Sequence, residues 1–182
     1  MKSCLLYLFC LLLLPGLLSF RTGTSRNNPP FAGQVNGDHK TLPIGAAAPD
    51  FSLPGTDGKT YSLSSFSKAD VLVIVFTCNH CPTAQAYEDR IIQLTEDYAP
   101  KNVAVVAIMP NDPKSINLDE LGYTDMGDSF DEMKVRAKEK KFNFPYLYDG
   151  ETEKASLAYG PIATPHVFIF DKKRILRYSG RI

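Results

Sequence analysis

The sequence predicts an α/β domain in which helices flank a central mixed β-sheet and a β-hairpin comes first. Two apolar runs rich in β-branched residues, Val71–Phe76 and Val103–Met109, are typical of central strands that are buried on both faces. The segment between them has apolar residues at spacings of three and four, which indicates a helix with one buried face. A strand–helix–strand unit places its two strands parallel with a right-handed crossover. Short strands later in the chain are expected to add an antiparallel pair.

The first predicted elements lie before and between the central strands. Two short alternating segments, 48–53 and 61–63, flank a turn-forming run at 55–59 and predict the hairpin. The helix between the central strands is expected to end at Pro100. Its buried face is expected to carry Ala84, Tyr87, Ile91, Leu94 and Tyr98.

The second half of the chain predicts one helix and three strands. The helix is expected from Ser129 to Lys140, because Ser129 and Glu132 have the spacing of a capping box. The strands are expected at 146–148, 166–170 and 175–178, with a turn at 171–173. A ligand site is expected beyond the carboxyl ends of the central strands.

The composition argues against several classes of protein. A chain of 182 residues that is 44% hydrophobic is long and apolar enough to form one ordinary domain. It lacks the low hydrophobicity and high net charge that are typical of intrinsically disordered proteins. The 20 Lys and Arg residues are balanced by 20 Asp and Glu residues, so the excess positive charge that drives nucleic-acid binding is missing. Four cysteines are too few for a small disulfide-stabilised scaffold, and their positions carry more information than their number.

Residues 1–20 have the layout of a secretory signal peptide, with a positive start followed by a nearly unbroken apolar run. The run is shorter than a membrane span of ~20 apolar residues, and an uncleaved N-terminal anchor is the main alternative. Cys4 and Cys10 are interpreted as apolar filler of this segment. Residues 21–42 predict a flexible linker before a domain at 43–182. We therefore expect an exported protein, periplasmic or extracellular, that contacts a membrane only through such an anchor.

The sequence Cys78-Asn79-His80-Cys81 directly follows the first central strand, where a helix is expected to begin. Backbone N–H groups and the dipole at a helix N-terminus stabilise a thiolate and lower the pKa of a cysteine there. We expect Cys78, at the head of the turn, to be the more exposed thiol and to attack the substrate, and Cys81 to resolve the mixed disulfide. A protonated His80 beside the pair would stabilise the thiolates further and thereby favour the reduced form.

Two other roles for the cysteine pair are weaker. A disulfide between residues so close in sequence closes a short loop and stabilises the fold little. A structural zinc site needs four protein ligands, whereas the domain offers only the two cysteines, His80 and His166, and His39 falls in the linker. The favoured interpretation is redox chemistry by a Cys78–Cys81 disulfide, with no metal and no other cofactor.

Three sequence marks point to a known family. They are APDFSLPGTDGK at 48–59, VLVIVFT before the cysteine pair, and Ala163-Thr164-Pro165 before a strand. With these marks the chain, from residue 43 onward, resembles the thioredoxin superfamily and is most similar to its redoxin, or alkyl hydroperoxide reductase/thiol-specific antioxidant, branch of peroxiredoxin-like and TlpA-like proteins. The resemblance implies a thioredoxin-like fold in which Pro165 is cis and faces the cysteines, and in which the backbone of Thr164 binds the substrate chain. Thr77 stands where relatives have an aromatic residue, so Thr77 is expected, with His80, to tune the pair.

The resemblance implies three possible functions. The first is a thiol–disulfide oxidoreductase that exchanges disulfides with protein or small-molecule thiols. The second is a thiol peroxidase for hydroperoxides, because Cys81-Pro82-Thr83 is similar to a peroxiredoxin motif, with Arg90 as a weak candidate for its arginine and with Thr77 out of register. The third is a copper chaperone similar to the Sco type, with His166 as the distant ligand and a cysteine spacing one residue short. The direction of electron flow, the partner and the oligomeric state are left open.

Two further expectations concern the ends of elements. The long acidic segment 111–128 is expected at the active-site end, as a lid, a partner surface or a solvated insertion. Related domains continue after the last strand into a helix that covers one sheet face, and this helix would be missing here.

Overall fold

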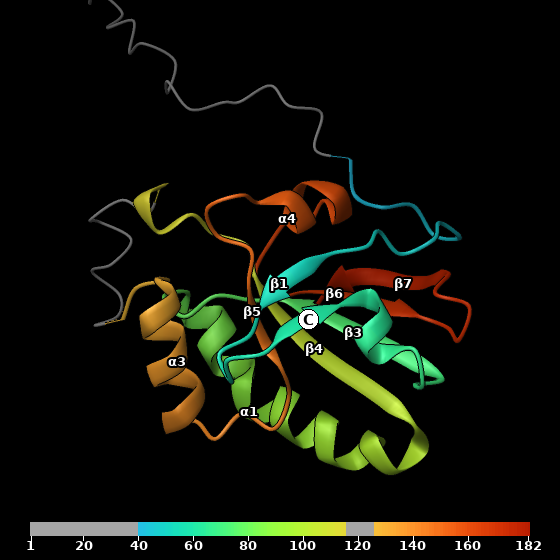
Figure 1. The fold of residues 1–182 in the computed structure, drawn as a ribbon, viewed down its shortest axis with the longest axis horizontal. Helices are drawn as coiled ribbons and strands as arrows, with labels where there is room; N and C mark the ends of the chain where they lie inside the picture. The colour runs from blue at the N-terminus through green and yellow to red at the C-terminus, as the bar shows by residue number, and fades with distance from the viewer. Residues whose placement is uncertain (1–39, 116–125) are drawn as a thin grey trace, which may run out of the picture. The chain divides into compact units, whose positions relative to one another are not determined.

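The computed structural model describes residues 40–115 and 126–182, which form one mixed α/β domain (Figure 1). The central sheet has five strands, in the order β5 (Tyr146–Tyr148), β4 (Val103–Met109), β3 (Val71–Phe76), β6 (His166–Phe170) and β7 (Leu176–Arg181). β3 is parallel to β4 and antiparallel to β6, so it lies at the centre of the sheet. β5 is parallel to β4, and β7 is antiparallel to β6. A separate hairpin pairs β1 (Ser52–Pro54) with β2 (Thr60–Ser62).

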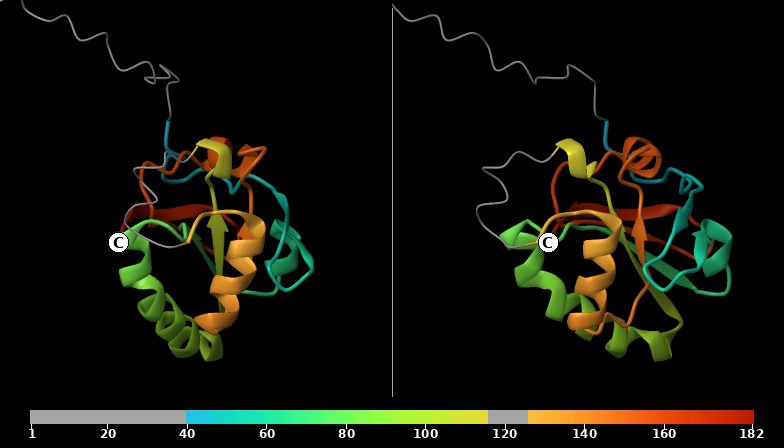
Figure 2. Two further views of the ribbon diagram at one scale, coloured as in Figure 1. Left: turned by 90° about the vertical axis from the view of Figure 1, so that its left-hand side faces the viewer. Right: turned by 60° about the vertical axis from the view of Figure 1, so that its left-hand side comes forward.

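Helices cover both faces of the sheet. α1 (Pro82–Tyr98) and α3 (Phe130–Glu139) lie on one face, and the hairpin and α4 (Lys154–Tyr159) lie on the other (Figure 2). Three short 3₁₀ turns complete the described part, namely η1 (Leu63–Phe66), η2 (Ala99–Lys101) and η3 (Pro113–Ser115).

The two faces of β3 explain why its sequence is a continuous apolar run. Leu72, Ile74 and Phe76 point into the core beneath the hairpin and α4, whereas Val73 and Val75 point into the core beneath α1 and α3. Side chains alternate between faces along a strand, so a strand with two covered faces has no polar position. Four side chains near the centre of the first core are fully buried aromatic rings, namely Phe76, Tyr159, Phe168 and Phe170.

Most predicted elements are confirmed, but the predicted buried face of α1 is wrong at its C-terminal end, where Leu94 is 37% and Tyr98 42% exposed because they border an open apolar cavity. The strands at 71–76, 103–109, 146–148 and 166–170 have the predicted bounds, and Ser129 caps α3 with the predicted capping box. The last strand continues to Arg181 rather than ending at 178, because its pairing with β6 holds the Ser-Gly-Arg segment extended. α4 was not predicted, because six residues are too few to show a helical repeat.

A buried ion pair joins α1 to α3. Arg136 donates from Nε and from one terminal nitrogen to the two carboxylate oxygens of Glu88, at 2.8 and 2.7 Å. The side chains are 15% and 6% exposed, and Lys140 Nζ lies 3.6 Å from the same carboxylate. Because such a two-pronged contact fixes both distance and orientation, it holds the helices that flank the cysteine segment in one relative position.

Some expectations fall on parts of the chain that are not described. The signal segment with Cys4 and Cys10, the linker up to residue 39, and residues 116–125 of the acidic segment lie outside the described residues. Within 40–115 and 126–182, no helix is both long and apolar enough to cross a membrane. A mainly apolar cavity of about 500 Å³ opens between α1, the adjacent sheet face and the last residues of the sequence, with Ile91, Leu94, Ile169 and Ile182 among its lining residues.

Candidate redox site

The candidate site lies where β3 passes into α1, at the carboxyl end of the central strand. Thr77 extends the sheet by one residue, because its N–H donates to a β4 carbonyl at 3.0 Å. α1 then begins at Pro82 with Cys81 as its N-cap, and proline suits this first helical position because no N–H partner is needed there. The cis peptide bond Thr164–Pro165 immediately precedes β6, and pairing of β6 with β3 brings it to the same edge. The predicted cis proline is therefore confirmed.

The expected exposure of the two cysteines is wrong. Cys78 is only 2% exposed and belongs to the core beneath α1 and α3, whereas Cys81 is partly exposed. The reason is the point at which the helix begins. Cys81, not Cys78, heads the helix, and Cys78 lies three residues earlier in a connection that turns into the core. Of the two thiols, that of Cys81 is therefore the more accessible to solvent.

Thr164 contacts both sulfur atoms. Its side-chain Oγ1 lies 3.2 Å from Cys78 Sγ, and its carbonyl oxygen accepts a hydrogen bond from Cys81 Sγ at 3.7 Å. Pro165 is buried directly after it. The structure thus brings together four of the predicted site residues, namely Cys78, Cys81, Thr164 and Pro165, around one turn.

Burial changes the chemistry of Cys78. Desolvation is the largest cause that raises the pKa of Cys78 to about 12, and the negative charge of Asp128 raises it further, against the opposing effect of the Thr164 hydroxyl. The lowered pKa expected for this thiol is therefore wrong. At neutral pH Cys78 keeps its proton, so a base must remove it before the sulfur can act as a nucleophile.

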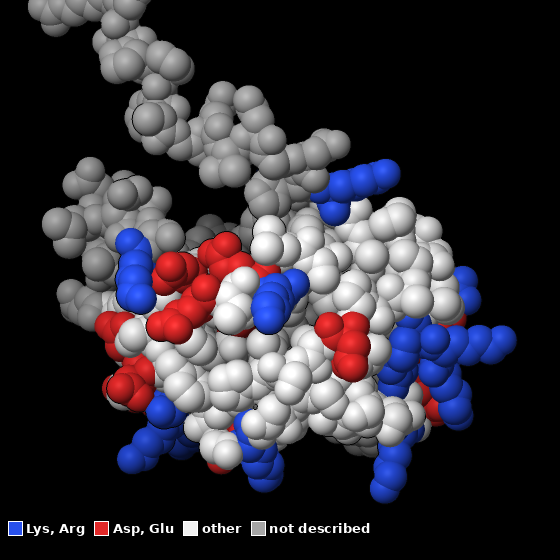
Figure 3. Space-filling model, turned by 45° about the horizontal axis from the view of Figure 1, so that its top comes forward, with Lys and Arg blue, Asp and Glu red and all other residues white. Residues whose placement is uncertain are grey.

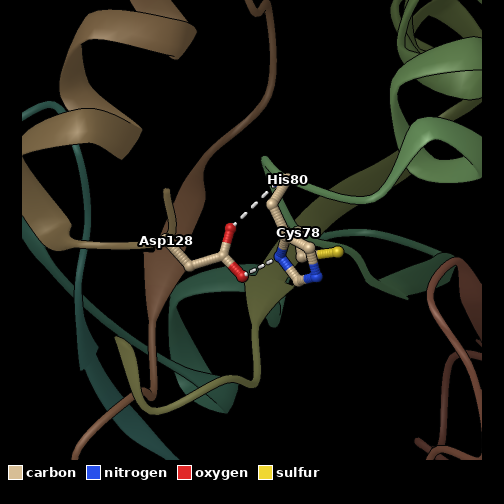
Figure 4. A group of neighbouring side chains, drawn as sticks. All are labelled: Cys78, His80 and Asp128. Atoms are coloured by element: carbon tan, nitrogen blue, oxygen red, sulfur yellow. Dashed lines mark hydrogen bonds and ion pairs between the residues drawn. The ribbon is translucent and has the colours of Figure 1, made fainter. Parts of the chain in front are cut away.

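A buried carboxylate organises the segment between the cysteines. Asp128, 1% exposed, accepts the backbone N–H groups of Asn79 and His80 on Oδ1, at 2.8 and 3.2 Å. Its Oδ2 lies 2.7 Å from His80 Nδ1 and 2.7 Å from Asn111 Nδ2. Figure 4 shows the imidazole beside both the carboxylate and the sulfur of Cys78. One possible ligand atom from each of these three side chains, the Cys78 sulfur, a His80 ring nitrogen and an Asp128 oxygen, lies within 4.8 Å of the other two.

Asn79 fixes the same segment from the other side. Its side-chain amide donates to the carbonyl of Gly127 at 2.9 Å, and its side-chain oxygen accepts from the hydroxyl of Tyr146 at 3.0 Å. Its backbone carbonyl accepts from Gln85 Nε2 at 2.6 Å. Asn79 is 1% exposed, and its hydrogen bonds stabilise the turn between the two cysteines. Of the two residues between the cysteines, His80 is therefore the one whose side chain can transfer a proton.

Sequence reasoning missed Asp128, Asn111 and Tyr146. Asp128 is the last residue of the acidic segment that was expected to be a lid or a solvated insertion, and nothing in the sequence separates it from the other acidic residues there. The sequence distinguishes Asp128 only by its position directly before Ser129, the predicted N-cap, because the backbone next to a helix N-cap has a fixed position. Among the described residues of this segment, Asn111, Gly127 and Asp128 make hydrogen bonds at the site.

Cys78, His80 and Asp128 each offer one possible metal-ligand atom within 4.8 Å of the other two, and the expectation that the site holds no metal stays a prediction. The two carboxylate oxygens of Asp128 already accept hydrogen bonds from two backbone N–H groups, an amide and an imidazole nitrogen. His166, the distant ligand of the copper alternative, uses Nδ1 to accept from the N–H of Ile162 and has Nε2 3.0 Å from the hydroxyl of Ser179. Both ring nitrogens of His166 are therefore engaged away from the cysteines.

The remaining candidates are Arg90 and Thr77. Arg90, the candidate arginine of the peroxidase alternative, lies over the ring of Tyr87 and lines the apolar cavity. Thr77 is buried, and its backbone N–H donates a hydrogen bond to the carbonyl of Ile108 in the sheet. The redox-tuning role of Thr77 stays a prediction.

Charged side chains are mixed on the surface. On the face shown in Figure 3, Lys and Arg side chains stand at several separate places around the edge, and Asp and Glu side chains gather mainly on one side. This face of the described residues does not present one broad basic surface, in keeping with the zero net charge of the chain.

Comparison with solved structures gives clear matches. An uncharacterized conserved protein from Geobacillus kaustophilus is 36% identical, with a TM-score of 0.68, over 78% of this chain and 70% of that one. A hypothetical protein from Sinorhizobium meliloti 1021 is 30% identical, with a TM-score of 0.68, over 78% of this chain and 72% of that one. A thiol-disulfide oxidoreductase from Bacteroides fragilis NCTC 9343, at 18% identity and a TM-score of 0.57, matches over 74% of this chain and 89% of that one and shares the fold.

Comparison with curated protein sequences gives no match. Comparison with protein families gives one that spans residues 44–179, which is almost the whole described domain and includes both cysteines and the cis proline. The fold, the paired cysteines and this match agree with one another. The chain belongs to the AhpC/TSA family.

Proposed function

We propose that the protein is a thiol–disulfide oxidoreductase in which Cys81 attacks a substrate disulfide and Cys78 resolves the mixed disulfide. The observation that carries the proposal is the arrangement of the two thiols around Thr164, with Cys81 partly exposed at a helix N-cap and Cys78 buried behind it. This order of roles reverses the one expected from the sequence.

The reaction proceeds in two exchanges. The Cys81 thiolate attacks one sulfur of the substrate disulfide, so that a Cys81–substrate bond forms and the other substrate sulfur leaves as a thiolate. Cys78, after losing its proton, attacks Cys81 Sγ, so that the Cys78–Cys81 disulfide forms and the second substrate sulfur leaves. The substrate gains two electrons and two protons in total, and the protein pair is oxidised by the same amount. The reverse sequence oxidises a dithiol substrate.

The peptide turn at Thr164 supports binding of an extended substrate chain next to Cys81. The Thr164 carbonyl faces Cys81 Sγ, and a hollow of about 310 Å³ beside it is lined by Asn111, Ser156, Leu157 and Ala163 among others. Backbone groups at an open edge can pair with an extended peptide. Protein disulfides and small disulfides are therefore the proposed substrates.

Trapping of the mixed disulfide tests the proposal. The Cys78→Ser variant should accumulate a stable covalent adduct with a disulfide substrate through Cys81, because the resolving thiol is gone. The Cys81→Ser variant is the matched control and should form no adduct at neutral pH. Mass spectrometry of the adducts after acid quenching identifies the linked cysteine. An adduct that forms only through Cys78 would refute the proposed order.

Titration of the pair against glutathione, with thiol trapping, determines the direction of electron flow. A reduction potential near ~−270 mV would identify a reductant of the thioredoxin kind, and one near ~−120 mV an oxidant of the DsbA kind. If the pair forms no disulfide at any ratio of oxidised to reduced glutathione, the proposal fails.

A thiol peroxidase is the second candidate, favoured by the Cys81-Pro82-Thr83 sequence at the start of α1 and by the family. In that reaction the Cys81 thiolate would attack a hydroperoxide, so that the O–O bond breaks, Cys81 becomes a sulfenic acid and the alcohol, or water from hydrogen peroxide, leaves. Cys78 would then condense with the sulfenic acid to a disulfide and release a water molecule. Consumption of hydrogen peroxide with a thiol donor, lost in Cys81→Ser, would support this activity.

We also propose that the protein acts outside the cytoplasm, because residues 1–20 have the layout of a signal peptide. Expression of the full chain followed by cell fractionation and N-terminal sequencing tests this proposal. An intact N-terminus in the cytoplasmic fraction would contradict it.

A further inference from the structure

We propose that His80, held by the buried carboxylate of Asp128, is the proton acceptor that activates Cys78 for the resolving step. The proposal rests on the thiol–disulfide exchange proposed above and adds two roles to it. His80 is the catalytic base, and Asp128 is a positioning residue that acts through His80.

The first argument is the way His80 is held. Its Nδ1 lies 2.7 Å from Asp128 Oδ2, and its backbone N–H donates to Oδ1 of the same carboxylate. A carboxylate on Nδ1 makes that nitrogen the proton-bearing one and leaves Nε2 free to accept a proton. The carboxylate is itself fixed by the N–H of Asn79 and the amide of Asn111. His80 therefore has one orientation and one free nitrogen.

The second argument is the position of His80 between the buried thiol and solvent. One side-chain atom each of Cys78, His80 and Asp128 lies within 4.8 Å of the other two, which puts the imidazole close enough to the thiol for proton transfer through one water or after the contact tightens during exchange. The His80 side chain is 17% exposed, whereas Asp128 and Cys78 are almost completely buried. A proton taken from Cys78 thus has a path to water or to the leaving thiolate through the imidazole.

The third argument is that Cys78 needs a base. It lies in the core, and the negative charge of Asp128 opposes formation of a second negative charge nearby. Two other titratable groups face the cluster. Cys81 lies at the start of α1, and Tyr146 on β5, whose hydroxyl binds Asn79, is buried and has a pKa raised well above 10. Tyr146 therefore stays protonated at neutral pH, which leaves His80 as the base that the geometry offers to Cys78.

The proton balance of the step is as follows. His80 Nε2 takes the proton of the Cys78 thiol as the sulfur attacks Cys81 Sγ, and the Cys78–Cys81 bond forms while the bond from Cys81 to the substrate sulfur breaks. The substrate leaves as a thiolate, which takes the proton from the imidazolium directly or through water. Asp128 keeps its negative charge and stabilises the imidazolium in between.

The test follows the two thiol exchanges separately with dithionitrobenzoate, whose thionitrobenzoate product absorbs visible light. All proteins are full chains that carry Cys4→Ser and Cys10→Ser, so that the domain pair alone reacts. The first release of thionitrobenzoate reports attack by Cys81, and the second reports resolution by Cys78. The leaving group is stable as a thiolate and needs no proton, so the second phase isolates proton removal from Cys78. Its rate is measured from pH 6 to pH 9.

The wild type should show a second phase whose rate levels off within this range. His80→Gln should slow that phase about 100-fold at pH 7, within the range of general-base effects, and its rate should rise tenfold per pH unit, because only hydroxide then removes the proton. Asp128→Asn keeps the imidazole but no longer holds it, so it should slow the phase about tenfold at pH 7, with a pH slope between those of the wild type and His80→Gln. The first phase should change by less than threefold in both variants.

Asp149→Asn is the matched control. Asp149 is also 2% exposed and accepts the N–H groups of Ala155 and Ser156 at the start of α4, so its replacement perturbs a buried aspartate without touching His80. It should leave the pH slope of the second phase unchanged. If His80→Gln and Asp128→Asn keep the wild-type slope and rate, the assignment of the base is overturned although the exchange function stands. If the wild type itself shows no second phase, the proposed function fails.

Discussion

The burial of Cys78 leads to a quantitative prediction about alkylation of the reduced protein. A thiol with a pKa of about 12 is ionised in roughly one molecule in 10⁵ at pH 7, whereas free cysteine, with a pKa near 8.5, is ionised in about one in 30. The more basic thiolate is also the better nucleophile, which recovers about 40-fold at a Brønsted coefficient of ~0.45. Cys78 should therefore react with iodoacetamide about 100-fold more slowly than free cysteine, before its 2% exposure slows it further.

The assay is a timed pulse of iodoacetamide on the reduced protein at pH 7, followed by peptide mass spectrometry. Cys78 and Cys81 fall on one tryptic peptide, so fragment ions assign the label to one residue or the other. We expect label on Cys81 first, and label on Cys78 only after denaturation or at strongly alkaline pH. Unfolded protein, in which both thiols are exposed, gives the reference rate.

Labelling of Cys78 at the rate of the unfolded protein, or before Cys81, would refute the reasoning. Either result would mean that Cys78 is accessible in the native state. The order of attack in the proposed function would then return to the one expected from the sequence.

Three further predictions concern stability. Arg136→Met should lower the free energy of unfolding, measured with urea, by about 3 kcal/mol, because the buried Glu88 carboxylate keeps only the ion pair with Lys140. Adding Glu88→Gln to the same chain removes the unpaired charge and should recover most of this loss. Phe168→Ala, which removes a fully buried ring packed against Phe76, should cost about 3–5 kcal/mol in the same measurement, and a loss under 1 kcal/mol would contradict the packing. Above about pH 8.5 the Cys78 thiol loses its proton in the unfolded chain, whereas in the folded chain it keeps the proton up to about pH 12. The free energy of unfolding should therefore fall as the pH rises, by up to about 1.4 kcal/mol per pH unit. The Cys78→Ala variant should lack this part of the pH dependence.

The sequence was sufficient for the central part of the fold because those elements have strong local patterns. β3 is apolar at each of its six positions, which only a strand covered on both faces tolerates, and the Ser129–Glu132 pair marks the start of α3 within the chain itself. α4 has no such pattern. Its start depends on Asp149, whose carboxylate accepts two of the first N–H groups of the helix, and that contact becomes visible only in three dimensions.

For the site, the sequence identified the residues but not their environments. Cys78, Cys81, Thr164 and Pro165 do lie together, as their motifs predicted. The roles of the two cysteines depend on which one caps the helix, and a shift of three residues in the helix start exchanges the buried and exposed positions. Asp128 escaped prediction because its function comes from hydrogen bonds to residues about 50 positions away.

The way in which α3 begins has a consequence for how this domain can vary among related proteins. Asp128 directly precedes the Ser129 cap, and the Glu132 side chain binds the N–H groups of both Gly127 and Ser129. The carboxylate that holds His80 is thus anchored from its C-terminal side, by a helix that Arg136 ties to α1. A change of length upstream should therefore leave the carboxylate in place as long as the contacts of Glu132 with Gly127 and Ser129 are kept. Related proteins that keep this helix start would be expected to keep the carboxylate beside His80, whatever the length of the segment before it.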